Sequence, residues 1–370
     1  MATDRIISAD SHVNPVRDLW TRDVPAAFRD RAPRVESTPM GDFWIVDSQV
    51  TGAIGLDASA GLKPEEFRPV GLSYKEMRPG SYDPKARLED MDIDGVSAEV
   101  LYFGGPVAQQ QKDPGLRRYI VQRYNDWMVE LSQAAPERLI GLAHVPLVDL
   151  DEACTELQRI AKLGLRGFHV DPFPDERGGK PLWDPDYEKF WALVAETRLP
   201  ISFHIVGARN HDVVATFTNP TPGVKESFIA MTPISLCEVV STLVFTGTLA
   251  RHPNLRFVLV ECGIGWIPYF LERMDQTFNK HRFWTKSVLT EKPSFYWYRQ
   301  GAATFIQDLS GVAERHRAGV QNILWSTDYP HSDSTWPRSR DALAEQFKGV
   351  PVDERALIAG GNAARLYDLN

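Results

Sequence analysis

Short apolar runs rich in β-branched residues alternate along the chain with amphipathic segments of helical length. This pattern is typical of a parallel sheet whose strands are joined by crossover helices. Clear helical segments are predicted over 115–134 and 186–197, where apolar residues recur at helical spacing. We expect eight strands, at residues 5–10, 98–103, 139–145, 167–170, 201–205, 256–261, 303–306 and 322–326.

Eight strand–helix units in this order predict a (β/α)8 TIM barrel, which is an α/β fold. A chain of 370 residues is long enough for such a barrel with enlarged loops, so we expect one domain over residues 1–370. The segment at about 20–80 breaks the rhythm, because it is rich in Pro, Gly and Arg. We predict a long insertion after strand one that acts as a lid over the pocket. Within it, the alternating residues 43–46 indicate a small strand pair.

Composition limits the class of partner. The chain has 41 Lys and Arg residues and 49 Asp and Glu residues, which gives a net charge of −8. It contains no run of basic residues, so we expect no nucleic-acid partner. No stretch approaches the roughly 18 uninterrupted apolar residues of a membrane helix, so we expect no membrane partner. The 3 cysteines are widely spaced, which suits a reducing, cytoplasmic compartment. We therefore predict a cytoplasmic protein with a small-molecule substrate, and the aromatic-rich residues 293–299 leave a homodimer open.

Functional residues of such barrels lie at the carboxyl ends of strands. Asp10 and His12 are two apart at the end of strand one, so their side chains project from the same face. His331 follows Asp328 by one turn, where it serves as an acid or base or as a partner that orients Asp328. Titratable residues mark six strands in all: Asp10 and His12, His144, His169, His204, Glu261, and Asp328.

Imidazole and carboxylate side chains together suit Zn, Fe(II) or Mn, whereas sites made only of oxygen suit Mg or Ca. Three or four such ligands leave a coordination position open for water, and a metal ion lowers the pKa of that water toward neutrality. The constellation therefore predicts a divalent transition metal and hydrolytic chemistry.

Four short motifs carry a resemblance to a known family. The chain resembles the amidohydrolase superfamily, and within it the amidohydrolase-related (amidohydrolase 2) group that includes aminocarboxymuconate-semialdehyde decarboxylase and the resorcylate-type decarboxylases. The motifs are Ala-Asp-Ser-His at 9–12, Leu-Pro-Ile-Ser-Phe-His at 199–204, His-Pro-Asn-Leu-Arg-Phe-Val at 252–258 and Ser-Thr-Asp-Tyr-Pro-His at 326–331.

The resemblance implies a set of metal ligands, namely Asp10, His12, His204 and Asp328. Members with two metals also use the ends of strands four and six, where this chain has His169 and Glu261. The resemblance therefore implies one or two ions, with Glu261 bridging them or His169 completing the coordination shell of the second ion.

Two positions depart from the decarboxylase pattern. Asn14 replaces a second histidine of the first motif, and Glu261 replaces the histidine that serves catalysis at strand six. A carboxylate acts as a base, a bridging ligand or a proton shuttle rather than as a cationic acid, which favours attack by metal-activated water.

Our leading prediction is accordingly a metal-dependent hydrolase. It would cleave an amide, ester, thioester or related bond in a small apolar or aromatic organic acid derivative, with Glu261, His331 and His169 as catalytic residues. The alternative is a metal-dependent nonoxidative decarboxylase of an aromatic or muconate-like acid. A further alternative is a catalytically silent barrel that binds a ligand and no transition metal.

Overall fold

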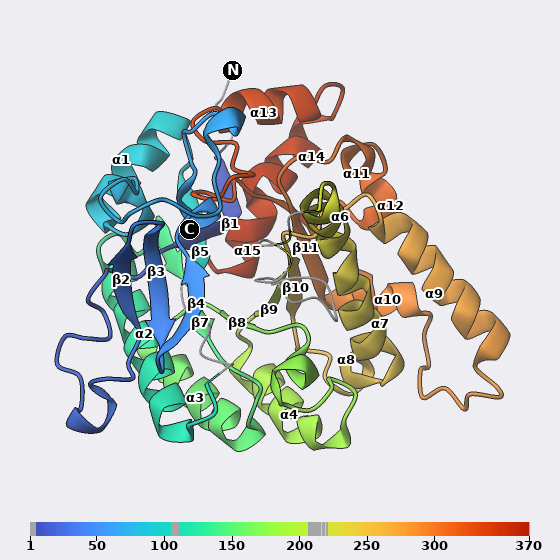
Figure 1. Ribbon diagram of the computed structural model, residues 1–370. Coiled ribbons are helices and arrows are strands. Elements are labelled where there is room, and N and C mark those ends of the chain that lie inside the picture. Colours follow the sequence, from blue (N-terminus) through green and yellow to red (C-terminus); the bar gives the residue numbers. More distant parts are fainter. Residues whose placement is uncertain (1–4, 105–110, 206–215, 217–218, 220, 370) are drawn as a thin grey trace.

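A ring of parallel strands forms the centre of the molecule, with helices around it (Figure 1). The computed structural model describes residues 5–104, 111–205, 216, 219 and 221–369. The ring strands are β1 (Ile7–Val13), β5 (Ala98–Phe103), β6 (Leu139–Gly141), β7 (Ala143–His144), β8 (Phe168–Val170), β9 (Ile201–His204), β10 (Phe257–Val260), β11 (Gly301–Phe305) and β12 (Ile323–Trp325).

The ring closes across two points where the strand ladders stop. The ladders run β1-β5-β6 and β12-β11-β10-β9-β8-β7. The third predicted strand is divided into β6 and β7, and the N–H of Leu142 between them donates to the carbonyl of Leu101 at 3.0 Å. Beyond β12, the N–H of Asp328 donates to the carbonyl of Asp10 at 2.9 Å. The predicted barrel is therefore confirmed, with strand three in two parts.

Helices on the outside of the ring cover the strands. The predicted helix over 115–134 is α2, which begins where the Asp113 carboxylate accepts hydrogen bonds from the N–H groups of Gly115 and Leu116. The helices are α1 (Pro84–Asp94), α2 (Pro114–Gln133), α3 (Leu150–Leu163), α4 (Glu188–Thr197), α6 (Val224–Met231), α7 (Cys237–Phe245), α8 (Thr248–Arg251), α9 (Ile267–His281), α10 (Pro293–Gln300), α11 (Leu309–Ala313), α12 (Arg315–Ala318), α13 (Ser339–Gln346), α14 (Val352–Ala356) and α15 (Asn362–Leu366).

The segment after β1 contains a small antiparallel sheet of β2 (Arg34–Thr38), β3 (Gly41–Val46) and β4 (Gln49–Ala53). It has three strands, one more than the predicted pair. The β3–β4 hairpin turns at Asp47 and Ser48, which both have positive φ, as a two-residue turn between twisted strands requires.

The inserted segment packs against the barrel through buried aromatic side chains. The ring of Trp44 lies against Trp20, with centroids 5.4 Å apart, and against Tyr74, with centroids 6.0 Å apart. Trp20 in turn donates its indole N–H to the carbonyl of Ile120 in α2 at 2.9 Å. Further along the segment, the N–H of Ala60 donates to the carbonyl of Pro330, beyond β12. The insertion therefore reaches the carboxyl ends of the strands.

One continuous helical stretch, Val224–Phe245, is long and apolar enough to span a membrane by length and composition alone. A helix that packs on the outside of a barrel meets the same two criteria. Within this stretch, 39% of the most apolar window is buried in the molecule, and α7 buries Val239, Val240, Leu243 and Val244. The stretch is therefore weak evidence for a membrane partner.

Replacing a buried phenylalanine in a barrel strand should destabilise the whole fold. Phe203 in β9 is fully buried, so Phe203→Ala should lower the free energy of unfolding by about 3–5 kcal/mol. Phe283 is 78% exposed, and Phe283→Ala is the matched control with little expected effect. Urea unfolding followed by circular dichroism measures both, and equal losses for the two variants would contradict this packing.

Candidate metal centre

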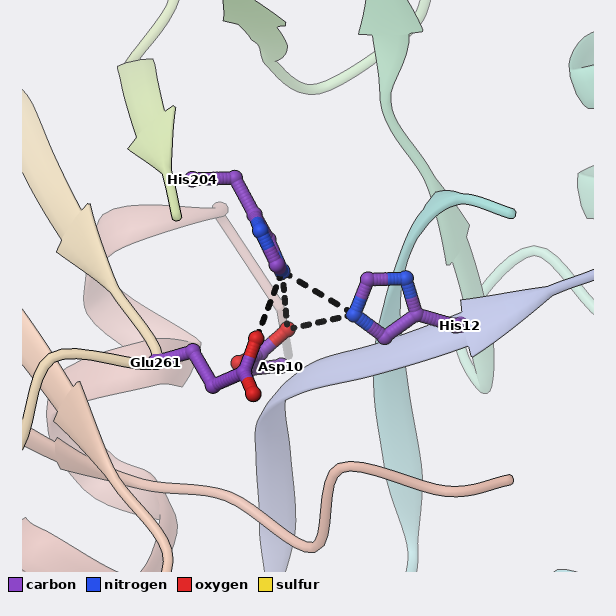
Figure 2. A group of neighbouring side chains, drawn as sticks. All are labelled: Asp10, His12, His204 and Glu261. Atoms are coloured by element: carbon purple, nitrogen blue, oxygen red, sulfur yellow. Dashed lines mark hydrogen bonds and ion pairs between the residues drawn. The ribbon is translucent and has the colours of Figure 1, made fainter. Parts of the chain in front are cut away.

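Four titratable side chains from the ends of three strands of the barrel converge on one point (Figure 2). Asp10 and His12 project from β1, His204 is the last residue of β9, and Glu261 directly follows β10. One ligand atom from each side chain lies within 4.8 Å of the others. The strand ends therefore bring together residues that are far apart in the sequence.

A second group overlaps the first and contains His12, Glu261, Asp328 and His331. Asp328 follows β12, and its Oδ1 lies 3.5 Å from Nε2 of His12. The two groups share His12 and Glu261. Together they contain every predicted ligand and catalytic residue except His169.

The two imidazoles at the centre present lone pairs to each other. Nδ1 of His12 lies 3.2 Å from the carbonyl of Phe103, and Nδ1 of His204 lies 2.7 Å from the carbonyl of Ile205. Because a carbonyl only accepts hydrogen bonds, each Nδ1 carries a proton, and the neutral form of either ring then has its lone pair on Nε2. The two Nε2 atoms are nevertheless only 3.0 Å apart. A cation that both rings bind would offset this repulsion.

Burial keeps His12 neutral. It lowers the pKa of His12 well below the usual value, and the neighbouring imidazoles of His331 and His204 lower it further. A neutral imidazole with a free Nε2 lone pair is the form that binds a metal ion.

The buried carboxylates of the cluster also need a nearby positive charge. Asp10 and Asp328 are fully buried, and both oxygens of Asp10 and Oδ2 of Asp328 have no hydrogen-bond partner within the described part of the chain. Oδ1 of Asp10 lies 3.5 Å from the Nε2 atoms of both His12 and His204. Burying an uncompensated carboxylate is costly, and metal coordination is one of the usual remedies. This donor set of two carboxylates and two imidazoles fits a divalent transition metal.

His331 contacts both His12 and Asp328. Its ring stacks on His12 with centroids 3.9 Å apart, and its Nδ1 lies 3.1 Å from Oδ1 of Asp328. Burial lowers the pKa of His331, but the carboxylates of Asp328, Asp57 and Glu261 together outweigh burial and raise the value to about 10. Of the two predicted roles, this contact favours that of a partner that orients Asp328.

Glu261 lies in a strained turn at the end of β10. Its φ is +59°, and its N–H donates to Oγ1 of Thr304 at 2.7 Å. Burial raises the pKa of Glu261 well above its usual range, and the nearby carboxylate of Asp328 adds to the increase. Asp328 also has a positive φ of 55°, so both acidic residues are held in backbone conformations that L-residues rarely adopt.

His169 lies outside both of these groups of titratable side chains. In the register of the sheet, His169 pairs with Ser202 and Val170 pairs with Phe203, so His169 lies two positions deeper in the barrel than His204. Its ring packs against that of His144, with centroids 4.7 Å apart. Its Nε2 is buried and has no hydrogen-bond partner in the described part of the chain, so a role for His169 as a ligand or catalytic residue stays a prediction. Asp171, two residues further toward the mouth of the barrel, accepts hydrogen bonds from the N–H of Phe173 and from Nε of Arg177.

Asn14, the departure in the first motif, contacts the insertion. Its Nδ2 donates to the carbonyl of Asp57 at 3.0 Å. Asp57 belongs to a short 3-10 helix, Leu56–Ala58, and its carboxylate contributes to the raised pKa of His331. The inserted segment therefore supplies an acidic side chain near the site, which no sequence motif indicated.

Comparison with known proteins agrees with this geometry. Residues 9–369 match the family model described as amidohydrolase. The chain belongs to the amidohydrolase family. It is 27% identical to the γ-resorcylate decarboxylase of Rhizobium radiobacter over 85% of this chain and 94% of that protein. It is 22% identical to the 2-amino-3-carboxymuconate-6-semialdehyde decarboxylase of Dictyostelium discoideum over 81% of this chain and 80% of that protein.

A solved structure of the same fold contains a metal ion. The dihydroxybenzoic acid decarboxylase of Polaromonas sp. JS666, with bound manganese and the inhibitor 2-nitroresorcinol, matches with a TM-score of 0.66 and 21% identity. The match covers 100% of this chain and 98% of that chain. The resemblance to the decarboxylase-containing group of amidohydrolases is therefore confirmed.

Loss of one imidazole should abolish metal retention. Because His204 shares the central point with His12 and Asp10, His204→Ala protein should retain no transition metal after dialysis, as measured by elemental analysis. The control is His316→Ala, since His316 is exposed and pairs with Glu354. Equal metal content in the two variants would refute this site.

Proposed function

We propose that this protein is a metal-dependent nonoxidative decarboxylase of a hydroxylated aromatic acid or a related unsaturated acid. The observation that carries the proposal is the donor set of Asp10, His12, His204 and Asp328 at the mouth of an amidohydrolase barrel. The names of its relatives, γ-resorcylate decarboxylase above all, supply the reaction class. Among the comparisons, only the family name supports the predicted hydrolysis, so the former alternative becomes our proposal.

One ion per chain fits the site better than two. Both ligand groups use His12, whose Nε2 has one lone pair and can bind one ion. We therefore assign a single ion to the place where the two groups overlap, with Asp10, His12, His204 and Asp328 as its ligands. The manganese bound by the Polaromonas enzyme supports Mn²⁺ as the first metal to test.

Decarboxylation replaces a carboxylate on carbon by a proton. The carbon–carbon bond to the carboxylate breaks, CO2 leaves, and the electron pair that remains on carbon takes up a proton. A bound divalent metal supplies positive charge that holds the carboxylate and a neighbouring hydroxyl oxygen of the acid.

In this proposal, Glu261 carries the proton. It lies next to the ligands, with Oε2 at 3.6 Å from Nε2 of His204, and the four ligands listed above are complete without it. His331 holds Asp328 in place through its 3.1 Å contact. The inserted segment, which reaches this end of the barrel at Asp57 and Ala60, limits access of water.

One observation keeps hydrolysis as a second candidate. Glu261 is a carboxylate at the strand-six position, where the resemblance to decarboxylases implies a histidine. A carboxylate is suited to accept a proton from water. The two candidates differ in their products, since one releases CO2 and the other consumes water.

Product analysis tests the proposal. Mn²⁺-loaded protein incubated with a panel of hydroxybenzoic acids that includes γ-resorcylate should release one CO2 for each acid consumed, measured by mass spectrometry of the gas and chromatography of the solution. Chelator-treated protein is the control and should be inactive. Absence of CO2 from the panel, together with turnover of an aromatic ester or thioester, would replace decarboxylation by hydrolysis.

Removing the proton carrier should affect the rate and not the metal. Glu261→Gln should lower kcat by about 10²–10⁴-fold, because it keeps the shape of the side chain and removes its acidic proton. Metal content should stay at the parental level. The control is Glu345→Gln on the exposed face of α13, which should change neither quantity. Metal loss in Glu261→Gln would instead identify Glu261 as a ligand.

A further inference from the structure

Arg87 of α1 is a buried arginine beside the metal centre that no motif singled out. Its exposed fraction is 2%, and its Nε lies 2.5 Å from Oε2 of Glu99 in β5, which is 3% exposed. Buried guanidinium groups are rare unless their donors are matched by acceptors. The contacts of this guanidinium therefore indicate its purpose.

Arg87 donates to three backbone carbonyls from three separate segments. Nη1 donates to the carbonyl of His12 at 2.8 Å and to that of Gly80 at 3.1 Å. Nη2 donates to the carbonyl of Tyr329 at 3.4 Å, and the guanidinium lies 4.3 Å from the centre of the Tyr329 ring. One side chain thus joins β1, the end of the insertion and the loop after β12.

Two of these carbonyls, those of His12 and Tyr329, lie where β1 meets the loop after β12. Both segments contain proposed metal ligands. Tyr329 directly follows Asp328, and its carbonyl also accepts the N–H of His12 at 2.6 Å. The N–H of Asp328 donates to the carbonyl of Asp10 at 2.9 Å. The backbone around Asp10, His12 and Asp328 is therefore one hydrogen-bonded unit, and Arg87 holds it from the side of α1.

We infer that Arg87 is a positioning residue for the metal centre: it sets the spacing between His12 and Asp328 by holding the backbone carbonyls of His12 and Tyr329. The inference rests on the metal site of the proposed function and is independent of the reaction at that site. Glu99 balances the buried charge, so that the guanidinium remains in place without water.

Arginine is needed here because of its shape. The planar guanidinium has five N–H donors in a fixed fork and reaches several acceptors at once, whereas the lysine ammonium is a point charge on a flexible stem. Arg87→Lys keeps the ion pair with Glu99 and loses the fixed grip on the carbonyls. The substitution therefore separates charge from positioning.

The test is the affinity for Mn²⁺, measured by isothermal titration calorimetry on metal-free protein. The dissociation constant of Arg87→Lys should rise roughly 10–100-fold, as is usual when a group that orients metal ligands is lost. The thermal unfolding of the metal-free variant, measured in parallel, shows whether it is folded. An unchanged dissociation constant in folded Arg87→Lys would overturn the inference.

The matched control is Arg138→Lys. Arg138 also donates to backbone carbonyls, those of Ser97 and Val96, and pairs with Asp92, but it does so before the first residue of β5. Its substitution should leave the Mn²⁺ affinity unchanged, and an equal loss in both variants would show a general effect of packing and overturn the inference.

A second variant keeps the inference testable if Arg87→Lys does not fold. The double variant Arg87→Met, Glu99→Gln removes both buried charges, which proteins often tolerate. It should show the same weakened Mn²⁺ binding, and parental affinity would overturn the inference. A protein that fails to release CO2 from any acid but shows these affinities would refute the proposed function and keep the role of Arg87.

Discussion

The repulsion among buried donor atoms at the barrel mouth is the constraint around which the rest of the structure is arranged. Two imidazole lone pairs face each other at 3.0 Å, and both oxygens of Asp10 have no hydrogen-bond partner in the described part of the chain. Such a cluster is unfavourable by itself and becomes favourable around a divalent cation. The backbone must therefore hold these side chains together against their repulsion.

The barrel holds them with backbone hydrogen bonds. Backbone hydrogen bonds between Asp328 and Asp10 and between His12 and Tyr329 join β1 to the loop after β12. The parallel ladder between β9 and β10 fixes the height of His204 relative to Glu261. Positive φ values at Glu261 and Asp328 turn the chain immediately after each strand. Rigid strands thus set the direction of each ligand, and the chemistry is left to the loops.

The sequence predicted the strands well because a hydrophobic run between polar turns leaves few other structures for the chain. It predicted the convergence of Asp10, His12, His204 and Asp328 because the carboxyl ends of parallel strands share one edge. It did not predict the depth of His169, since the register between β8 and β9 depends on packing. Arg87 was missed because an arginine in a charged helix normally faces solvent, and Glu99, its counterion, lies in another strand.

The central claim is that this chain holds one divalent metal ion between Asp10, His12, His204 and Asp328. A crystal structure with Mn²⁺, using its anomalous scattering, tests this claim most directly. The account predicts one anomalous peak for each chain, about 2.0–2.3 Å from Nε2 of both histidines and from an oxygen of each aspartate. A peak elsewhere, no peak, or two peaks in this cluster would contradict it.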